Sequence, residues 1–427
     1  MEILCHPAPE TWMQLAERNI PGDEAIAKSV ADIVATVRRE GDVALRNYAL
    51  KFDGATLQDL ELSEQEIEMA ASRVSPAVKT AIQQAATNIQ RFHEAQRHQE
   101  VDVTTLAGVR CVQRAVPIQR VGLYIPGGQA PLFSTVLMIG LPAMIAGCKE
   151  IILCTPQNKQ GTIAPEIIYS ASICGIRRIF RVGGAQAIAA MAYGTESIPR
   201  VDKIFGPGNR FVTKAKQMVT DSVAIDMPAG PSEVLVMADH SAHPAYVAAD
   251  MLSQAEHGPD SQAVLVCHSE DFAAKVRAEV ERQSALLLRA SSVEQSLAHS
   301  RIIILENRDD MVAFANTYAA EHLIISMEAP WQIAQQITAA GSVFIGNYSP
   351  ESAGDYASGT NHTLPTSSWA RSYSGVNLDS YVRKITYQEL TADGLKTLAP
   401  TIITMADAEG LDAHAVAVKI RLQEPSA

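Results

Sequence analysis

The sequence predicts an α/β protein in which helices pack on parallel sheets. From residue 121 onward, short apolar runs end in turns rich in glycine and proline, and segments with helical spacing of apolar residues follow the turns. Repeated strand–turn–helix units of this kind are typical of parallel sheets. With 427 residues, of which 47% are hydrophobic, the chain exceeds what one hydrophobic core usually serves, so we expect two or more domains.

The part of the chain before these units is predicted to be mainly helical. Residues 1–21 are short segments broken by proline and show no clear pattern, whereas residues 23–51 and 63–97 repeat apolar residues at helical spacing. In the second segment, Ile67 and Ile82 belong to one apolar face, which indicates a packing role rather than chemistry.

Two runs of strands follow. The first run comprises residues 121–126, 151–156, 179–184, 203–208 and 233–238. The second run comprises residues 263–267, 301–305, 322–326 and 342–346. Because each run carries its own helices, we expect two α/β halves that face a cleft, an arrangement suited to an enzyme whose cofactor and substrate bind to different halves.

Three glycine-rich turns in the first run precede helices, at residues 126–128, 183–186 and 206–209. Free backbone N–H groups and the helix dipole at such positions favour an anionic ligand, and a dinucleotide pyrophosphate is the natural candidate. None of the turns is a complete G-x-G-x-x-G motif, and glycine also serves tight strand–helix turns. A structural role therefore stays open for each of them.

Side chains that can bind metal gather at the end of a helix predicted from residue 243 to residue 252. Gly258 and Pro259 supply its stop signal. Gln254 and His257 are three residues apart, so we expect them on one face of the last turn, where both can point at one metal ion. A histidine near a helix C-terminus has a second explanation, because imidazolium interacts favourably with the helix dipole.

Two later segments also carry polar side chains of interest. A long glycine-rich loop is predicted over residues 349–365, and Asp355 and His362 stand out in it. The C-terminal region is predicted to form two helices, with Glu409 and His414 on either side of their joint. Taken alone, Glu409 and His414 are equally explained as ordinary surface groups.

Composition and charge exclude several classes of protein. A net charge of −12 opposes nonspecific binding to nucleic acid, and no cluster of Lys and Arg marks a phosphate-binding face. No apolar run reaches the roughly 18 residues of a membrane span, and the first residues lack the pattern of a secretory signal, so we expect a cytoplasmic protein. The 6 cysteines show no C-x-x-C spacing, which indicates reduced thiols, mostly buried.

Six segments together resemble the histidinol dehydrogenase family. They are SQAEHGPDS (253–261), EHLII (321–325), SPESAGDYASGTNH (349–362), GGAQAIAA (183–190), KIFGPGN (203–209) and DMPAGPSEVLV (226–236). The resemblance covers about residues 121–421. Two departures from the family's usual residues, Ala320 in place of proline and Gly410 in place of a bulkier residue, remove no functional group.

This resemblance implies an activity. Members of the family oxidise L-histidinol through L-histidinaldehyde to L-histidine, the last steps of histidine biosynthesis, with zinc and two NAD. They are homodimers with shared active sites. The resemblance therefore implies an NAD-dependent enzyme whose partners are a small-molecule substrate and a second copy of the chain.

The resemblance also implies a role for each matching side chain. The zinc ligands, of which the last reaches in from the partner subunit, match Gln254, His257, Asp355 and His414. The acid/base pair matches Glu321 and His322. The NAD site matches Tyr124, Gln186 and Asn209. The substrate contacts, with Glu409 again from the partner subunit, match Ser232, His362 and Glu409 together with His322 and the four zinc ligands.

The resemblance further implies that the two residues of the acid/base pair have different tasks. His322 deprotonates first the alcohol and then the hydrate, each time as a hydride passes to one NAD. An imidazole, with an ordinary pKa of about 6.5, can take and return protons repeatedly near neutral pH. Glu321 activates the water that adds to the intermediate aldehyde.

The family's fold further implies a division of the chain. The expected parts are an N-terminal segment over 1–21, an α/β domain over 22–122 and 234–373 with most of the zinc and catalytic site, an NAD-binding α/β domain over 123–233, and a dimerisation segment over 374–427 that is helical from residue 387 to residue 423. Both sheets are implied to be incomplete, Rossmann-like and related to the aldehyde dehydrogenase fold.

Three other functions stay open. A paralogous zinc and NAD enzyme of the same fold could oxidise another small polar alcohol, such as a sulfonated diol, although Glu409 with His414 favours an imidazole substrate. A thiol-dependent aldehyde dehydrogenase reaches an acid through a cysteine, but Cys148 and Cys154 lie among apolar residues, where a thiolate is disfavoured. A non-catalytic metal-binding protein leaves the acid/base pair unexplained.

Overall fold

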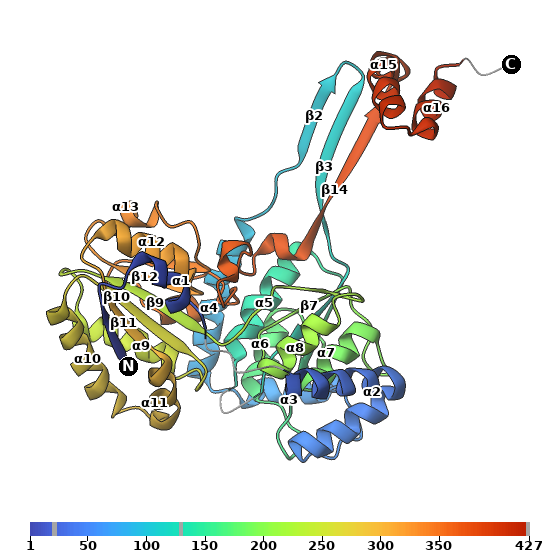
Figure 1. The fold of residues 1–427 in the computed structure, drawn as a ribbon. Helices are drawn as coiled ribbons and strands as arrows, with labels where there is room; N and C mark the ends of the chain where they lie inside the picture. The colour runs from blue at the N-terminus through green and yellow to red at the C-terminus, as the bar shows by residue number, and fades with distance from the viewer. Residues whose placement is uncertain (19–23, 128–130, 424–427) are drawn as a thin grey trace. The chain divides into compact units, whose positions relative to one another are not determined.

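The computed structural model describes residues 1–18, 24–127 and 131–423. The chain forms two compact units, of which the first comprises Met1–Gln96 with Ile118–Ser380 and the second comprises Arg97–Pro117 with Tyr381–Ala427. The first unit contains two parallel sheets with helices packed on them (Figure 1). The predicted α/β fold class is confirmed. Within the described ranges, no helix combines the length and the apolar composition that crossing a bilayer requires.

The six-stranded sheet is parallel throughout, in the order β1-β11-β10-β9-β12-β13. Its strands are β1 (Glu2–Cys5), β9 (Glu233–Ala238), β10 (Gln262–Cys267), β11 (Arg301–Ile304), β12 (His322–Ser326) and β13 (Ser342–Ile345). On β9, Val234 and Val236 pack into one hydrophobic core, whereas Leu235 and Met237 pack into another. Both faces are therefore buried, which explains the continuous apolar sequences of the inner strands.

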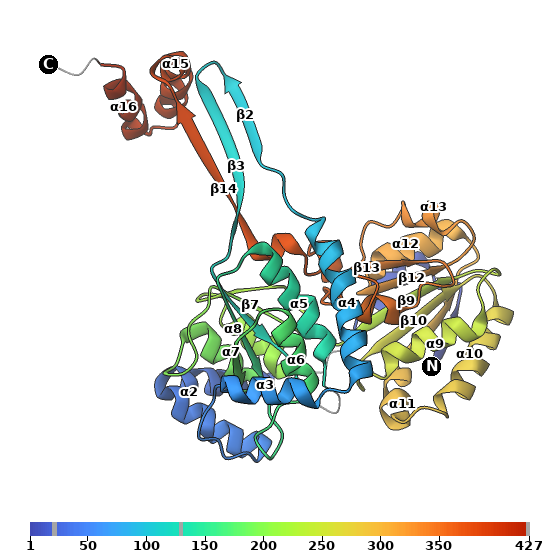
Figure 2. The same cartoon turned by 180° about the vertical axis from the view of Figure 1, so that it is seen from behind.

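Helices cover both faces of this sheet (Figure 2). One face packs against α9 (Pro244–Ala255), α10 (Glu270–Ser284) and α11 (Ala290–His299). The other packs against α1 (Trp12–Leu15), α12 (Arg308–Tyr318) and α13 (Pro330–Ala334). The segment 349–365, predicted to be a loop, contains α14 (Glu351–Tyr356), which packs on α9. Short 3₁₀ turns lie at Pro9–Thr11, Trp369–Arg371 and Leu378–Tyr381.

The five-stranded sheet is also parallel, in the order β6-β5-β4-β7-β8. Its strands are β4 (Arg120–Tyr124), β5 (Glu150–Thr155), β6 (Arg178–Arg181), β7 (Lys203–Phe205) and β8 (Ala224–Ile225), and its helices are α5 (Phe133–Ala146), α6 (Pro165–Ile173), α7 (Gly184–Tyr193) and α8 (Arg210–Met218). The first predicted run of strands needs one correction, because residues 233–238 form β9 of the other sheet. That strand pairs with β10 and β12, and such pairing between distant segments leaves no mark in the strand's own sequence.

Three helices near the amino terminus pack beside the five-stranded sheet. They are α2 (Glu24–Tyr48), α3 (Glu64–Arg73) and α4 (Pro76–Glu94), and α2 continues into a π-helical turn (Ala49–Asp53). The helix α2 contacts α7 and α8, α3 contacts α6, and α4 contacts α5. The α4 helix also contacts residues of the range 234–373, since the Asn88 amide donates to the Ala357 carbonyl at 2.8 Å. The expected grouping of residues 22–122 with residues 234–373 stays a prediction. The single helix predicted over 63–97 is wrong, because Pro76 cannot continue a helix and Ser75 caps a new one by accepting the N–H of Val78.

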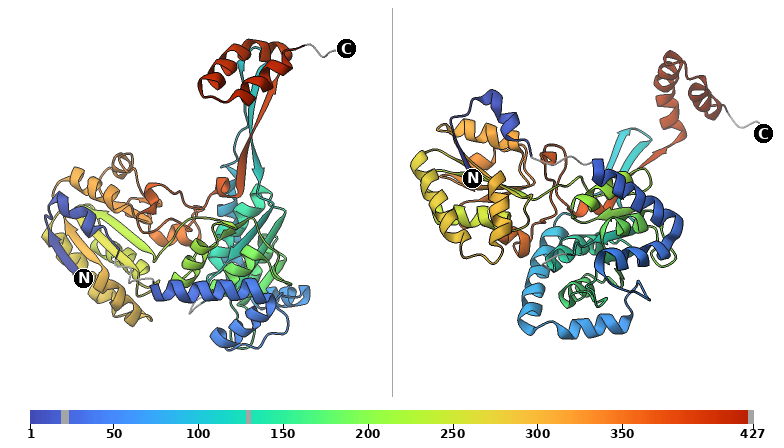
Figure 3. Two further views of the ribbon diagram at one scale, coloured as in Figure 1. Left: turned by 45° about the vertical axis from the view of Figure 1, so that its right-hand side comes forward. Right: turned by 60° about the horizontal axis from the view of Figure 1, so that its bottom comes forward.

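The second unit contains a three-stranded antiparallel sheet in the order β14-β3-β2 (Figure 3). Its elements are β2 (Val101–Leu106), β3 (Val109–Pro117), β14 (Val382–Leu390), α15 (Ala392–Ala408) and α16 (Asp412–Arg421). Residues 387–390, predicted to be helical, are the end of β14, and α15 begins only after Thr391 caps it. The C-terminal segment thus shares its sheet with residues 97–117.

A kink in α2 is held by contacts with the loop after α7. Gly41 has φ 53° and ψ −130°, and Asp42 donates its N–H to Glu196 Oε2 at 2.8 Å. The Asp42 carboxylate accepts the N–H and the hydroxyl of Ser197. A Cβ at Gly41 would lie 2.3 Å from Glu196 Oε2, so glycine alone fits both the backbone conformation and this contact.

We expect Gly41→Ala to lower the free energy of unfolding by roughly 1–3 kcal/mol, because it strains the backbone and displaces the Glu196 carboxylate. Denaturant unfolding followed by circular dichroism measures this loss. Gly175→Ala is the matched control, since Gly175 also has a positive φ of 71° but a Cβ there meets nothing within 4 Å. A loss no larger than that of the control would mean that the Glu196 contact does not hold the kink.

Candidate functional site

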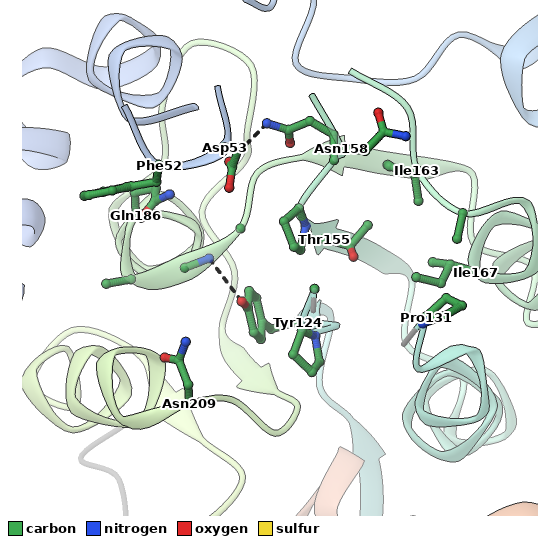
Figure 4. Close-up of a pocket in the computed structure, with 18 of the residues that line it drawn as sticks. Phe52, Asp53, Tyr124, Pro131, Thr155, Asn158, Ile163, Ile167, Gln186 and Asn209 are labelled. Atoms are coloured by element: carbon green, nitrogen blue, oxygen red, sulfur yellow. Dashed lines mark hydrogen bonds between the residues drawn. The ribbon is translucent and has the colours of Figure 1, made fainter. Parts of the chain in front are cut away.

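A cavity of about 830 Å³ lies at the carboxyl ends of β4, β5 and β6 (Figure 4). This is the usual place for a ligand in a parallel α/β sheet. The three residues expected to bind NAD all line it, namely Tyr124, Gln186 and Asn209. Among the described residues, no Lys or Arg lines this cavity. An anionic ligand there would therefore depend on backbone N–H groups in the first turn of α7, because a side chain already caps the start of α8.

The glycines of the turns have a packing role as well. A Cβ at Gly127 would lie 2.1 Å from the side chain of Pro156, and a Cβ at Gly183 would lie 2.4 Å from it. Larger residues would force the turns away from the strand end. Gly128, which belongs to the first predicted turn, lies outside the described residues.

Two of the predicted cofactor residues also fix the local backbone. The buried Tyr124 hydroxyl accepts the N–H of Gly184 at 3.0 Å. Asn209 caps α8, because its Oδ1 accepts the N–H groups of Phe211 and Val212 at 3.1 and 3.2 Å. Both side chains thus hold helix starts at the edge of the cavity.

A second cavity, of about 550 Å³, is lined by loops that follow or precede strands of both parallel sheets. It brings together four residues predicted for catalysis or substrate binding, namely Ser232, His257, Glu321 and His362. Asn209 lines this cavity as well as the first. Ligands in the two cavities would therefore meet beside this residue.

Glu321 and His322 lie where β12 begins, so this part of the site is at the amino end of the six-stranded sheet. The two residues are only 6% and 4% exposed. Nδ1 of His322 lies 3.6 Å from Glu351 Oε1 and 3.8 Å from Glu321 Oε2, and Nε2 lies 3.6 Å from Asp355 Oδ1. Three carboxylates thus surround one imidazole ring.

Glu351 was not predicted to belong to the site. It begins α14, and Asp355 follows four residues later, so both carboxylates share one face of this helix. Glu351 is 1% exposed, and neither of its oxygens has a hydrogen-bond partner among the described residues. The signal in the sequence is the spacing of Glu and Asp in ESAGD, which has meaning only once the segment is known to be helical.

The acidic surroundings shift the protonation of these groups. Burial lowers the pKa of His322, but Glu351, Glu321 and Asp355 outweigh it and raise that pKa to about 10. Burial raises the pKa of Glu321 to about 8 and raises that of Glu351 well above its ordinary value. For Asp355, burial is outweighed by the neighbouring His322, which lowers the pKa. The excess of carboxylates over imidazole favours a cation at this centre.

Donor atoms suited to a metal ion face one another here. Ligand atoms of His322, Glu351 and Asp355 all lie within 4.8 Å of one another. Gln254, on α9, is fully buried, and neither atom of its amide has a hydrogen-bond partner in the described part of the chain. Because a buried amide without partners is unfavourable, its oxygen fits the role of a ligand to an ion.

His257 needs a correction, because it does not lie on the last turn of a helix. The helix α9 ends at Ala255, and the N–H of His257 donates to the Gln254 carbonyl at 3.2 Å just beyond it. Nδ1 of the ring lies 3.0 Å from the Ser253 carbonyl, which places the ring proton on Nδ1 and the lone pair on Nε2. Histidines that bind metal are commonly oriented by such a second bond.

The remaining predicted residues fall into two groups. Burial lowers the pKa of His362, and its ring bonds through Nδ1 to the Asp355 carbonyl at 2.8 Å and through Nε2 to the Thr135 hydroxyl at 3.1 Å. Glu409 and His414 belong to the second unit, on either side of the turn between α15 and α16. Their part in the site stays a prediction.

Cysteine chemistry finds no support at either cavity. In the parts that the structure describes, no cysteine lines either cavity. Burial raises the pKa of Cys148 to about 12 and raises that of Cys154 further. Both thiols therefore stay protonated near neutral pH, which disfavours a thiol-dependent mechanism.

The fold and these two cavities define the class of protein as an α/β protein with two adjoining cavities, one at the carboxyl ends of parallel strands and one beside a buried Glu–His pair. The family model described as histidinol dehydrogenase matches residues 16–422. The chain therefore belongs to the histidinol dehydrogenase family.

Similar proteins cover nearly the whole chain. The histidinol dehydrogenase of Bacteroides thetaiotaomicron is 52% identical over 423 residues, which are 99% of each chain. That of Aliivibrio fischeri is 53% identical over 402 residues, 93% of this chain and 91% of the relative. A crystal structure of histidinol dehydrogenase from Elizabethkingia anophelis superposes with a TM-score of 0.96 at 50% identity, over 99% of this chain and 98% of the other.

We expect Gln254→Met to raise the free energy of unfolding of chelator-treated protein by about 1 kcal/mol, because it removes a buried amide without partners and preserves side-chain size. Urea unfolding in chelator measures this. Gln262→Met is the matched control and is expected to destabilise, since the buried Gln262 amide donates to the His299 carbonyl at 2.9 Å and accepts the Tyr318 hydroxyl at 2.7 Å. Destabilisation by both variants would contradict the view that the Gln254 amide lacks a partner.

Proposed function

We propose that the chain is a zinc-dependent histidinol dehydrogenase that oxidises L-histidinol through L-histidinaldehyde to L-histidine and reduces two NAD, in the last steps of histidine biosynthesis. Membership of the family supports this proposal. The observation that carries it is the buried Glu321–His322 pair, of which Glu321 lines a cavity together with Ser232, His257 and His362. Two adjacent titratable groups suit a reaction that removes protons in two successive oxidations.

The zinc ligands in this proposal are Gln254, His257, Asp355 and, from the partner subunit, His414. The unpaired amide of Gln254, the Nε2 lone pair of His257 and the charge on Asp355 form a mixed set of nitrogen and oxygen donors that fits zinc. When bound, zinc holds the amino and imidazole nitrogens of the substrate and so orients the carbon that reacts. Ser232 and His362 line the cavity in which the substrate would lie.

His322 is the base. Because Nδ1 faces Glu351 and Glu321, the ring keeps its proton at Nδ1 and presents the lone pair at Nε2. Nε2 takes the hydroxyl proton of the alcohol in the first oxidation and that of the hydrate in the second, and releases each proton before the next. A cation bound at Asp355 would lower the raised pKa of His322 and so favour the neutral ring that accepts a proton.

Glu321 takes a proton from the water that adds to the aldehyde. The N–H of Glu233 donates to its Oε2 at 2.9 Å, which fixes the carboxylate at the edge of the cavity. Burial raises the pKa of Glu321 to about 8, so its carboxylate is a stronger base than an exposed one.

NAD, which accepts the hydride, is proposed to occupy the cavity of about 830 Å³. The positive ends of the α7 and α8 dipoles and the backbone N–H groups that follow Gly184 in α7 suit its pyrophosphate. Tyr124 and Asn209 support these helix starts through the hydrogen bonds described above, and Gln186 lies in the first turn of α7.

A homodimer is proposed in which Glu409 and His414 complete the site of the partner subunit, with Glu409 at the substrate's imidazole. Large apolar side chains exposed on the second unit support a contact between proteins. Four of them are between 45% and 60% exposed, namely Met405, Leu411, Val416 and Ile420. They lie on α15, on α16 and at the turn between them.

Formation of NADH tests the proposed function. We expect purified protein to form two NADH for each L-histidinol oxidised and far less from a panel of small alcohols that includes a sulfonated diol. A strong chelator should abolish turnover, and zinc should restore it, because unpositioned substrate reacts slowly. Full activity in protein shown to be metal-free would overturn the zinc assignment, and equal activity with other alcohols would overturn the substrate.

Variants of the acid/base pair test the division of work between the two residues. Glu321→Gln should slow the oxidation of L-histidinaldehyde by roughly 100-fold or more and that of L-histidinol much less, because only the aldehyde step consumes water. His322→Asn should slow both oxidations. Single-turnover measurements with each substrate give the two rates. Equal losses on both substrates for Glu321→Gln would contradict its role in activating water.

A further inference from the structure

Glu321 and Glu233 hold each other across the start of two neighbouring strands. The N–H of Glu233 donates to Glu321 Oε2 at 2.9 Å, and the N–H of Glu321 donates to Glu233 Oε1 at 3.3 Å. Both residues are buried, since Glu233 is 1% exposed and Glu321 is 6% exposed. The orientation of the Glu321 carboxylate therefore depends on the backbone of Glu233, and the Glu321 backbone depends on the carboxylate of Glu233.

Two buried carboxylates this close require a compensating cation. Arg18 supplies it, because Nε donates to Glu233 Oε2 at 2.6 Å and Nη2 donates to Glu233 Oε1 at 2.7 Å. This is a two-point ion pair, and the two side chains are 8% and 1% exposed. The Glu233 carboxylate is thus paired with a cation and also accepts the N–H of Glu321.

The guanidinium of Arg18 has its full set of partners. Its other N–H groups donate to the Tyr318 carbonyl at 2.9 Å, to the Ser368 hydroxyl at 2.9 Å and to the Ala16 carbonyl. Its carbon Cζ also lies 3.7 Å from the centre of the Tyr318 ring. A group held at every donor is rigid, and a rigid support is what a precisely oriented base needs.

We propose that Arg18 and Glu233 are positioning residues for Glu321, so that a side chain from the N-terminal segment orients the carboxylate that activates water. This inference rests on the proposed function of Glu321. In it, Arg18 holds the Glu233 carboxylate through two hydrogen bonds, that carboxylate fixes the start of β12, and the Glu233 N–H fixes Oε2 of Glu321. Neither Arg18 nor Glu233 lines the cavity proposed for the substrate.

A merely structural role for the ion pair predicts something else. If Arg18 only anchors the N-terminal segment, its loss lowers the stability of the protein and reduces both oxidations alike. If Arg18 acts through Glu321, its loss affects the aldehyde oxidation selectively. The two effects can be separated, because Arg301 also anchors this segment, by donating to the Leu15 carbonyl at 2.6 Å, without bonding to either glutamate.

The test compares the rates of the two oxidations in Arg18→Met, Arg18→Lys and Arg301→Met. We expect Arg18→Met to lower the kcat for L-histidinaldehyde by about 10- to 100-fold, with little change in KM and a much smaller loss on L-histidinol, as is usual for residues that support a reactive group. Arg18→Lys keeps the charge but loses the two-point geometry. It should therefore lower the kcat for L-histidinaldehyde by a smaller factor, again with a much smaller effect on L-histidinol. Arg301→Met should lower stability and leave the ratio of the two rates unchanged.

A double variant completes the test. In a Glu321→Gln background, Arg18→Met should cause no further loss in the aldehyde step, because its effect passes through Glu321. Losses that add in the double variant, or equal losses on both substrates, would overturn the positioning role. If Arg18→Met does not fold, Arg18→Lys decides by the same criteria. A wild-type protein that oxidises neither substrate would instead overturn the proposed function, and this inference with it.

Discussion

The parallel pairing of β9 with β12 determines where the acidic groups of the site stand. It brings Glu233 beside Glu321 and sets His322 opposite Val234. Because both strands lie inside the sheet with their faces buried in two hydrophobic cores, the polar groups at their amino ends sit where little water can screen them. The short helix α14 then completes the centre by bringing two more carboxylates to the imidazole.

The site concentrates polar groups that the fold itself does not satisfy. The amide of Gln254, both nitrogens of His322 and both oxygens of Glu351 are buried without hydrogen-bond partners among the described residues. Such groups lower stability wherever they occur, and they persist when the surrounding framework fixes them. Here the framework is the pair of hydrophobic cores on the two faces of one sheet. It holds these side chains in positions where their polar atoms can bond to a ligand although they do not bond to one another.

Local patterns in the sequence predict the elements well but not their partners. The strand predicted over 151–156 is observed at Glu150–Thr155, one residue away, because an apolar run between turns specifies a buried strand. The sheet to which β9 belongs depends on β10 and β12, which its own residues do not encode. The helix α14 escapes prediction because its composition is typical of a loop, and its buried face exists only in contact with α9 and the imidazole.

The candidate site is likewise predictable from the sequence only in part. The family resemblance selects Glu321, His322 and Asp355, and the structure brings these three together. The roles of Arg18 and Glu233 could not be predicted, because they depend on contacts with residues 215 and 88 positions away. Glu233 lies in the quoted segment DMPAGPSEVLV, but the segment does not show which residues its carboxylate contacts. The resemblance predicts the side chains proposed to perform chemistry. The groups that hold these side chains in place can be identified only from the contacts in the structure.

The edge strand β1 has a consequence for how the molecule is made. Residues 2–5 find their place in the sheet only beside residues 301–304, so during synthesis the beginning of the chain has no partner until most of the chain has left the ribosome. Pairing across such a separation is slow, and until it happens the edge of β11 is open to other chains. Arg18 follows β1 by 13 residues. One stretch of chain therefore supplies both the strand that covers the edge of β11 and the cation that pairs with Glu233.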